Sequence, residues 1–173
     1  IEYALQKLGA EGGVVVGGNS ASNNLRWANS ALTTNGDSVE RTIAISAFVG
    51  VSGGVGSGMA SGQFRDRRDI DDLVSASVAA ARSAGPAVDA MDLVSGPQHE
   101  DFETGAQDLG VAELTHVSRG LANILPNRSQ EFFGYAEQSR DTTYVGTSEF
   151  PRCRSRPRFR NRNFRKWNQD GRS

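Results

Sequence analysis

The sequence is poor in the residue types that mark disulfide-rich, membrane-spanning and exported proteins. Its single cysteine, Cys153, cannot form an internal disulfide, which agrees with a reducing compartment. No apolar run approaches the roughly 20 residues that span a bilayer. The first residues are not a basic region followed by an apolar one, so no signal peptide is expected. We therefore expect a cytoplasmic protein.

The sequence has only two histidines, too few for the usual zinc hydrolase motif. His99-Glu100 begins a His-Glu-x-x-His pattern, but Glu103 and Thr104 stand where the second histidine would fall. His116 belongs to a different predicted element. The glycine-rich run 51–58 lacks the Gly-Lys-Ser/Thr ending of a phosphate-binding loop and is interpreted as a hairpin connection. We therefore predict no catalytic residue, no metal ligand and no cofactor in this chain.

The small net charge of −1 conceals two unlike parts. Residues 1–150 contain 10 Lys and Arg and 19 Asp and Glu, a net charge of −9, whereas residues 151–173 contain nine Lys and Arg and one Asp, a net charge of +8. The Arg-rich end continues no apolar period, so residues 150–173 are expected to be a disordered tail. Two interpretations stay open for this tail: a frameshift-derived, non-native end, or a segment that binds nucleic acid through its cations and aromatic rings.

Alternating and turn-forming residues in the first third of the chain predict a sheet. Gly12–Gly18 is predicted to be a buried strand and Asn19–Asn24 a polar turn. Leu25–Thr34 and Val39–Val51 are predicted to be the arms of a hairpin that reverses at Asn35-Gly36, because Asn-Gly favours the conformations of a tight turn. A second turn and a small-residue strand are expected within residues 50–62.

Helical periods alternate with further strands in the rest of the chain. Asp66–Gly85 has helical spacing, acids at its start and a Gly-Pro stop. A weaker helical pattern covers residues 108–125, and residues 2–9 resemble the end of a helix. Residues 132–138 and 142–147 are predicted to be a strand pair that turns at 139–141. The expected fold is α+β, an antiparallel meander sheet with two helices packed on one face.

Several segments, in order, resemble the N-terminal domain of the TldD/PmbA family of metallopeptidases in its actinobacterial form. The resemblance covers residues 1–149 and stops at Phe150. The segments that carry it are Leu25-Arg26-Trp27-Ala28-Asn29-Ser30, Thr33-Thr34-Asn35-Gly36, the strand 41–49, the small-residue segment 58–62, the helix 69–84, Phe133-Gly134-Tyr135-Ala136-Glu137-Gln138 and Thr142-Thr143-Tyr144-Val145-Gly146-Thr147.

The resemblance implies a cytoplasmic hydrolase that dimerises with a TldD/PmbA-type subunit and takes part in the proteolysis of unfolded peptides. In that family zinc is bound in a C-terminal half, which this chain does not contain. The implied role is therefore a truncated N-terminal fragment that shapes the substrate chamber and the dimer, and is inactive alone. The motif positions carried over, without an assigned role, are Arg26, Trp27, Asn29, Asn35 and Gly36; Trp27 is expected to be a core residue. The alternative hypothesis is a small α+β binding module with a basic, nucleic-acid-binding tail.

Overall fold

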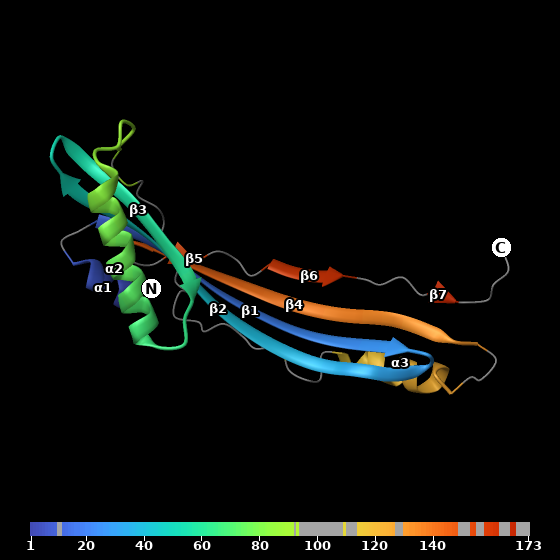
Figure 1. Ribbon diagram of the computed structural model, residues 1–173. Coiled ribbons are helices and arrows are strands. Elements are labelled where there is room, and N and C mark those ends of the chain that lie inside the picture. The colour runs from blue at the N-terminus through green and yellow to red at the C-terminus, as the bar shows by residue number, and fades with distance from the viewer. Residues whose placement is uncertain are drawn as a thin grey trace. The chain divides into compact units, whose positions relative to one another are not determined.

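The computed structural model describes residues 1–9, 12–91, 93, 109, 114–126 and 130–148, together with the backbone of three short strands closer to the C-terminus. Three helices and seven strands are assigned within these residues (Figure 1). They are α1 (Glu2–Leu8), β1 (Gly12–Ala28), β2 (Ala31–Val51), β3 (Gly54–Gln63), α2 (Arg67–Ala84), α3 (Thr115–Ile124), β4 (Phe132–Thr147), β5 (Cys153–Arg154), β6 (Arg158–Arg162) and β7 (Trp167–Asn168).

The long strands form one sheet in the order β3-β2-β1-β4. β2 and β3 are antiparallel, with Thr42 opposite Gln63 and Val51 opposite Gly54. The short strands β5, β6 and β7 pair with β4. The predicted α+β class and the antiparallel meander are therefore confirmed, and α1 is the helix end that the sequence predicted over residues 2–9.

The chain divides into two compact units, to both of which β1, β2 and β4 contribute residues. Unit 1 comprises 1–19, 40–106 and 142–157, and unit 2 comprises 20–39, 107–141 and 158–173. The division predicted from the sequence, a domain 1–149 and a tail 150–173, stays a prediction. The side chains of the tail lie outside the described residues.

The core of unit 1 lies between its strands and the helices α1 and α2. The alternation in β2 buries every second residue from Ile43 to Val49, as the sequence predicted. These side chains pack with Ala4 and Leu8 of α1 and with Ile70, Val74 and Ala81 of α2. α2 lies across β3 (Figure 1), where Gly56 and Gly58 leave no side chain between the strand and the helix backbone. Glycine at these positions permits the close approach.

Helix α2 begins and ends where the sequence predicts. Asp66 is the N-cap residue, and its carboxylate accepts hydrogen bonds from the backbone N–H groups of Arg68, at 2.7 Å, and Asp69. The Asp69 carboxylate in turn accepts a bond from the N–H of Asp66, which completes a capping box. Gly85 follows the last turn with a φ of 72°, a conformation that favours glycine.

Unit 2 has a small core beneath α3. Leu25 of β1, Ala136 of β4 and Leu114 are buried together, with Trp27 and Val117 packed against them. Of the helix predicted over 108–125, Thr115–Ile124 is helical, Leu109 is buried, and 108 and 110–113 lie outside the described residues.

The hairpin between β1 and β2 turns at Asn29-Ser30, so the predicted turn at Asn35-Gly36 is wrong. Asn29 and Ser30 have φ values of 50° and 58°, whereas neither Asn35 nor Gly36 has a positive φ. The Ser30 hydroxyl accepts a hydrogen bond from the N–H of Phe132 at 3.1 Å, and the Ser30 N–H donates to the Phe132 carbonyl. These contacts with β4 fix the earlier turn, and Asn35-Gly36 are left as extended residues of β2.

Two other predicted turns are strand in the structure. Asn19–Asn24 continues β1, and its burial alternates through Ala21 and Asn23. Ser139–Asp141 lies within the single strand β4. Both segments were interpreted as turns because they are polar, but a strand with one covered face accepts polar residues at every second position. The turn predicted within 50–62 is confirmed between β2 and β3.

Candidate functional site

β3 is the terminal strand of the sheet, and one side of its backbone has no partner strand among the described residues. The carbonyl of Arg41 accepts a hydrogen bond from the N–H of Phe64. The even-numbered residues of β3 therefore direct their N–H and C=O groups toward β2. The carbonyl of Val55, by contrast, accepts a bond from the N–H of Ala87, which lies outside the sheet. Backbone direction alternates along a strand, so the N–H and C=O groups of Ser57, Met59 and Ser61 point away from β2. We call these groups the outer edge of β3.

The sequence of β3 contains neither of the residue types, charged residues and proline, that often protect an edge strand. This sequence is GVGSGMASGQ. Ser57, Met59 and Ser61 are exposed, Met59 at 67%. Within the described residues, only the Ala87 bond to Val55 occupies an outward-facing group of this strand. The strand is therefore able to accept main-chain hydrogen bonds from another extended chain.

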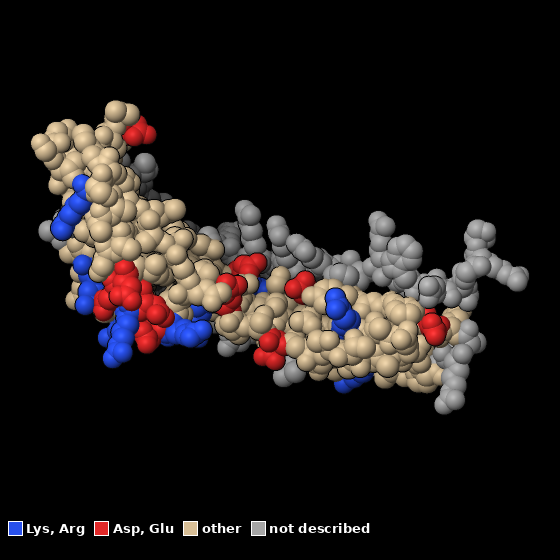
Figure 2. Space-filling view, in the orientation of Figure 1, with Lys and Arg blue, Asp and Glu red and all other residues tan. Residues whose placement is uncertain are grey.

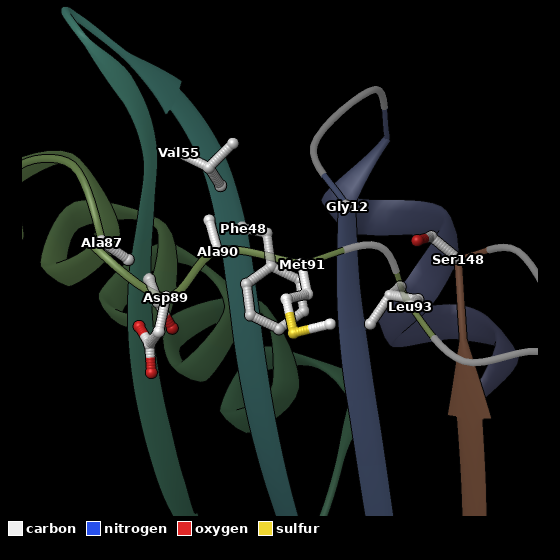
Figure 3. Close-up of a pocket in the computed structure, with 10 residues that line it drawn as sticks. Gly12, Phe48, Val55, Ala87, Asp89, Ala90, Met91, Leu93 and Ser148 are labelled. Atoms are coloured by element: carbon white, nitrogen blue, oxygen red, sulfur yellow. The ribbon is translucent and has the colours of Figure 1, made fainter.

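The same residues of β3 place their side chains on a sheet face that α1 and α2 do not cover. Phe48 lies opposite Ser57 and Ser46 opposite Met59, and paired residues share a face. We call this surface the open face. Figure 3 shows α2 behind the strands and residues 87–91 in front of them. Among the described residues, these are the ones that cover one end of the open face.

A hollow of about 920 Å³ lies on the open face beneath residues 87–91 (Figure 3). Its apolar walls come from Phe48, Val55, Met91 and Leu93. The remaining lining residues are small or polar: Gly12, Ser57, Ala87, Asp89, Ala90 and Ser148. Asp89 is the one charged residue among them, and Met91 is 90% exposed. A volume of this size is typical of sites that take a small ligand or a large side chain.

A second hollow of about 470 Å³ adjoins the other end of the open face. Its lining residues carry no charge: Val16, Gly18, Thr42, Ile43, Ala44, Ser61, Gly62, Gln63 and Thr143. The open face of unit 1 is therefore indented at both ends, and of the two hollows only the one beneath residues 87–91 has an acidic residue, Asp89, among its described lining residues.

Charged side chains of unit 1 gather instead around the N-terminal end of α2, as Figure 2 shows. The Asp71 carboxylate accepts a hydrogen bond from the Tyr3 hydroxyl at 3.0 Å and lies 3.3 Å from the Lys7 ammonium. The Arg67 guanidinium lies 4.9 Å from the centre of the Tyr3 ring. The hydrogen bonds with Tyr3 and Asp71 raise the pKa of Lys7 above its usual value. This cluster holds α1 against α2.

The five motif positions carried over from the resemblance all lie in unit 2, whereas β3 belongs to unit 1. Arg26 is exposed, with its guanidinium 5.8 Å from the centre of the Tyr135 ring. The half-buried Trp27 lies over Gly134, where a Cβ would come within 2.3 Å of the indole. Asn29 forms the turn, and Asn35 and Gly36 lie in β2. The structure therefore gives these residues packing and turn positions and does not join them into a chemical site.

The described residues hold no group of three His, Cys, Asp or Glu side chains that could bind a metal ion. His116 is exposed on α3, and His99 and Glu100 lie outside the described residues. The described residues therefore do not fit the zinc centre of a metallopeptidase, and no catalytic step is derived from them. Within the same residues, no helix has the length and apolarity needed to cross a membrane.

One serine has the spacing of a nucleophile elbow. Ser52 stands in the Gly-x-Ser-x-Gly pattern of Gly50–Gly54, but it lies in the tight turn between β2 and β3. A nucleophile elbow joins a strand to a helix and is supported by a histidine and an acid. The setting of Ser52 is therefore that of an ordinary hairpin residue.

The sequence does not indicate the outer edge of β3 or the hollow beside it. The only signal was the run of ten uncharged residues in β3, which was interpreted simply as a small-residue strand. A free edge depends on the order of strands in the sheet, and the sequence pattern does not give that order.

The fold recurs in solved structures although no protein-family model and no curated protein sequence matches the chain. TldE from Thermococcus kodakarensis is similar with a TM-score of 0.58 and 10% identity, over 95% of this chain and 41% of that one. A putative modulator of DNA gyrase from Bacteroides thetaiotaomicron gives 0.57 and 12%, over 96% and 42%. Another from Thermotoga maritima gives 0.52 and 12%, over 96% and 40%.

The chain therefore spans about two fifths of the length of each of these proteins. At 10–12% identity the similarity establishes a shared fold. The resemblance to the TldD/PmbA family that the sequence suggested is confirmed at the level of that fold.

Proposed function

We propose that the chain is the N-terminal part of a TldD/PmbA-type peptidase and that it holds unfolded peptides in an extended form. The observation that carries the proposal is the outer edge of β3, where the backbone groups of Ser57, Met59 and Ser61 have no partner strand among the described residues and the strand itself carries no charge. The similarity to TldE and to the two putative gyrase modulators over 95–96% of the chain supports the family assignment.

The geometry favours a peptide that is extended and otherwise unselective. Main-chain hydrogen bonds to the outer edge accept any residue except proline, because each residue supplies the same N–H and C=O groups. The edge carries no charge that would repel acidic or basic peptides. A folded protein has few unpaired strands to offer, so the site selects unfolded segments.

In this proposal the chain contributes binding and a partner contributes hydrolysis. We propose a cytoplasmic homodimer or heterodimer with a TldD/PmbA-type subunit, in which zinc belongs to a catalytic half that the 173 residues do not include. The chain would form part of the chamber in which the peptide lies. Contact with nucleic acid is assigned only to the basic residues 150–173, whose net charge is positive.

A proline substitution in the outer edge tests the proposal. Met59→Pro removes an N–H that points away from β2 and leaves the ladder between β2 and β3 intact, because proline is tolerated where an edge N–H faces solvent. We expect about tenfold weaker binding of a fluorescent, uncharged peptide of Ala, Thr and Ser, measured by anisotropy, since one or two hydrogen bonds are lost.

Met59→Ala is the matched control, because it removes the exposed side chain and keeps the N–H. Its affinity should equal that of the unaltered chain, and circular dichroism should show that both variants are folded. Equal binding by Met59→Pro, or no binding by the unaltered chain, would exclude the outer edge as the peptide site.

A further inference from the structure

Ser57 belongs to both the outer edge of β3 and the hollow, which makes these two features one surface. Its backbone faces away from β2, and its side chain lines the hollow. Residues directly opposite each other in neighbouring strands point to the same face, with their Cβ atoms about 5 Å apart. A peptide residue that pairs with Ser57 therefore places its side chain on the open face at the mouth of the hollow.

The side chains in line with Ser57 leave room for that residue. Ser57 is opposite Phe48, and a Cβ on Gly12 would lie 3.8 Å from the Cβ of Phe48. In the two neighbouring strands, the half-buried Phe48 therefore has the small residues Gly12 and Ser57 beside it. Figure 3 shows the Met91 side chain beside the Phe48 ring, within the segment that crosses the face. The flexible, polarizable thioether can adjust to an inserted group.

The chemistry of the walls defines what fits. Among the described residues that line the hollow, Phe48, Val55, Met91 and Leu93 offer apolar contact, and Asp89 is the one acidic residue. An acidic side chain would lose hydration here and face a like charge. An apolar side chain would gain buried area against the Phe48 ring.

We propose that the hollow is a specificity subsite that takes a large apolar side chain, such as Leu, Met or Phe, from the peptide residue paired with Ser57, and disfavours Asp and Glu there. This inference rests on the proposed function, since it needs a peptide on the outer edge of β3. It adds one selective position to binding that is otherwise independent of sequence.

A host peptide series measures this selectivity on the full chain. A labelled, uncharged peptide of Ala and Thr carries a single Ala, Leu or Asp at each position in turn. We expect Leu to bind about tenfold more tightly than Ala at one position of the register, which is the gain from burying a few methylene groups. Asp at that position should bind more weakly than Ala.

Two matched variants locate the subsite. Ser57→Phe places a ring in the mouth of the hollow, so it should abolish the preference for Leu over Ala, which is read as the ratio of the two affinities for the same variant. Met59→Phe adds the same ring to an exposed residue of the same strand that does not line the hollow, so the preference for Leu should persist. Asp89→Asn should reduce the penalty on Asp alone.

The outcomes separate the two proposals. If no peptide of the series binds, the proposed function fails and this inference fails with it. If all peptides bind and Leu gains nothing over Ala at any position, the peptide edge stands and the subsite is excluded. A preference for Leu that survives Ser57→Phe also excludes this subsite.

Discussion

At the residue scale, Gly58 of β3 allows helix α2 to pack closely on the sheet in unit 1. A Cβ on Gly58 would lie 2.2 Å from the N of Ala81 and 2.5 Å from the carbonyl oxygen of Ser77. Both are backbone atoms of a helix that is packed through Ile70 and Val74, so they cannot rotate away as the end of a side chain could. The whole helix would have to move.

Gly58→Ala is therefore expected to lower the free energy of unfolding by about 2 kcal/mol, the usual cost of overpacking a rigid contact. Gly50→Ala is the matched control, because Gly50 lies in the adjacent strand with no atom within 4 Å of its Cβ position and without a positive φ. We expect the control to change stability by less than about 0.5 kcal/mol. Urea unfolding followed by circular dichroism gives both values, and equal stability of the two variants would contradict the close contact.

At the scale of elements, the hairpin between β1 and β2 turns at Asn29-Ser30, although Asn35-Gly36 is the stronger turn signal in the sequence. Asn29 has a φ of 50°, which is costly for most residues and tolerated by Asn. We expect Asn29→Ala to destabilise the protein by about 1 kcal/mol, and Asn35→Ala, in extended β2, to change stability by less than about 0.5 kcal/mol. Thermal unfolding of the two variants tests this. If Asn35→Ala were the more destabilising substitution, the turn would lie at Asn35-Gly36 and not at Asn29-Ser30.

Elements with a single, uninterrupted period could be predicted from the sequence, and elements with polar interruptions could not. The run from Ile43 to Val49 alternates without a break, so the C-terminal part of β2 was predicted although the strand begins earlier, at Ala31. α2 carries both its N-cap Asp66 and its terminal Gly85, so its bounds were predicted closely. The long strands β1 and β4 were divided at Asn19–Asn24 and Ser139–Asp141, because local polarity resembles a turn when the neighbouring strands are unknown.

The candidate site was beyond the reach of the sequence for a related reason. Ser57, Met59 and Ser61 are ordinary small or flexible residues, and their interest comes from the position of β3 at the end of the sheet. The hollow brings together Phe48, Met91 and residues far apart in the chain. Neither property has a local pattern, whereas a catalytic motif would have had one.

At the scale of the whole molecule, binding and hydrolysis are expected to be separate properties. The chain spans about two fifths of TldE and of the putative gyrase modulators, and its described residues contain no group that fits a metal ion. Main-chain hydrogen bonds at the outer edge of β3 require no metal. We therefore expect the purified chain to bind the uncharged host peptide with the same affinity in zinc and in a chelator, and to leave it intact.

Anisotropy gives the affinity, and mass spectrometry of the peptide after prolonged incubation gives the extent of cleavage. Cleavage that stops on chelation would assign a metal centre to residues outside the described part of the chain, such as His99 and Glu100. Binding that disappears on chelation, with the fold unchanged by circular dichroism, would show that the metal and not the edge strand holds the peptide. Binding that needs no metal and is not followed by cleavage is the result expected of a subunit that only captures the peptide. Hydrolysis of the peptide would then have to come from a partner.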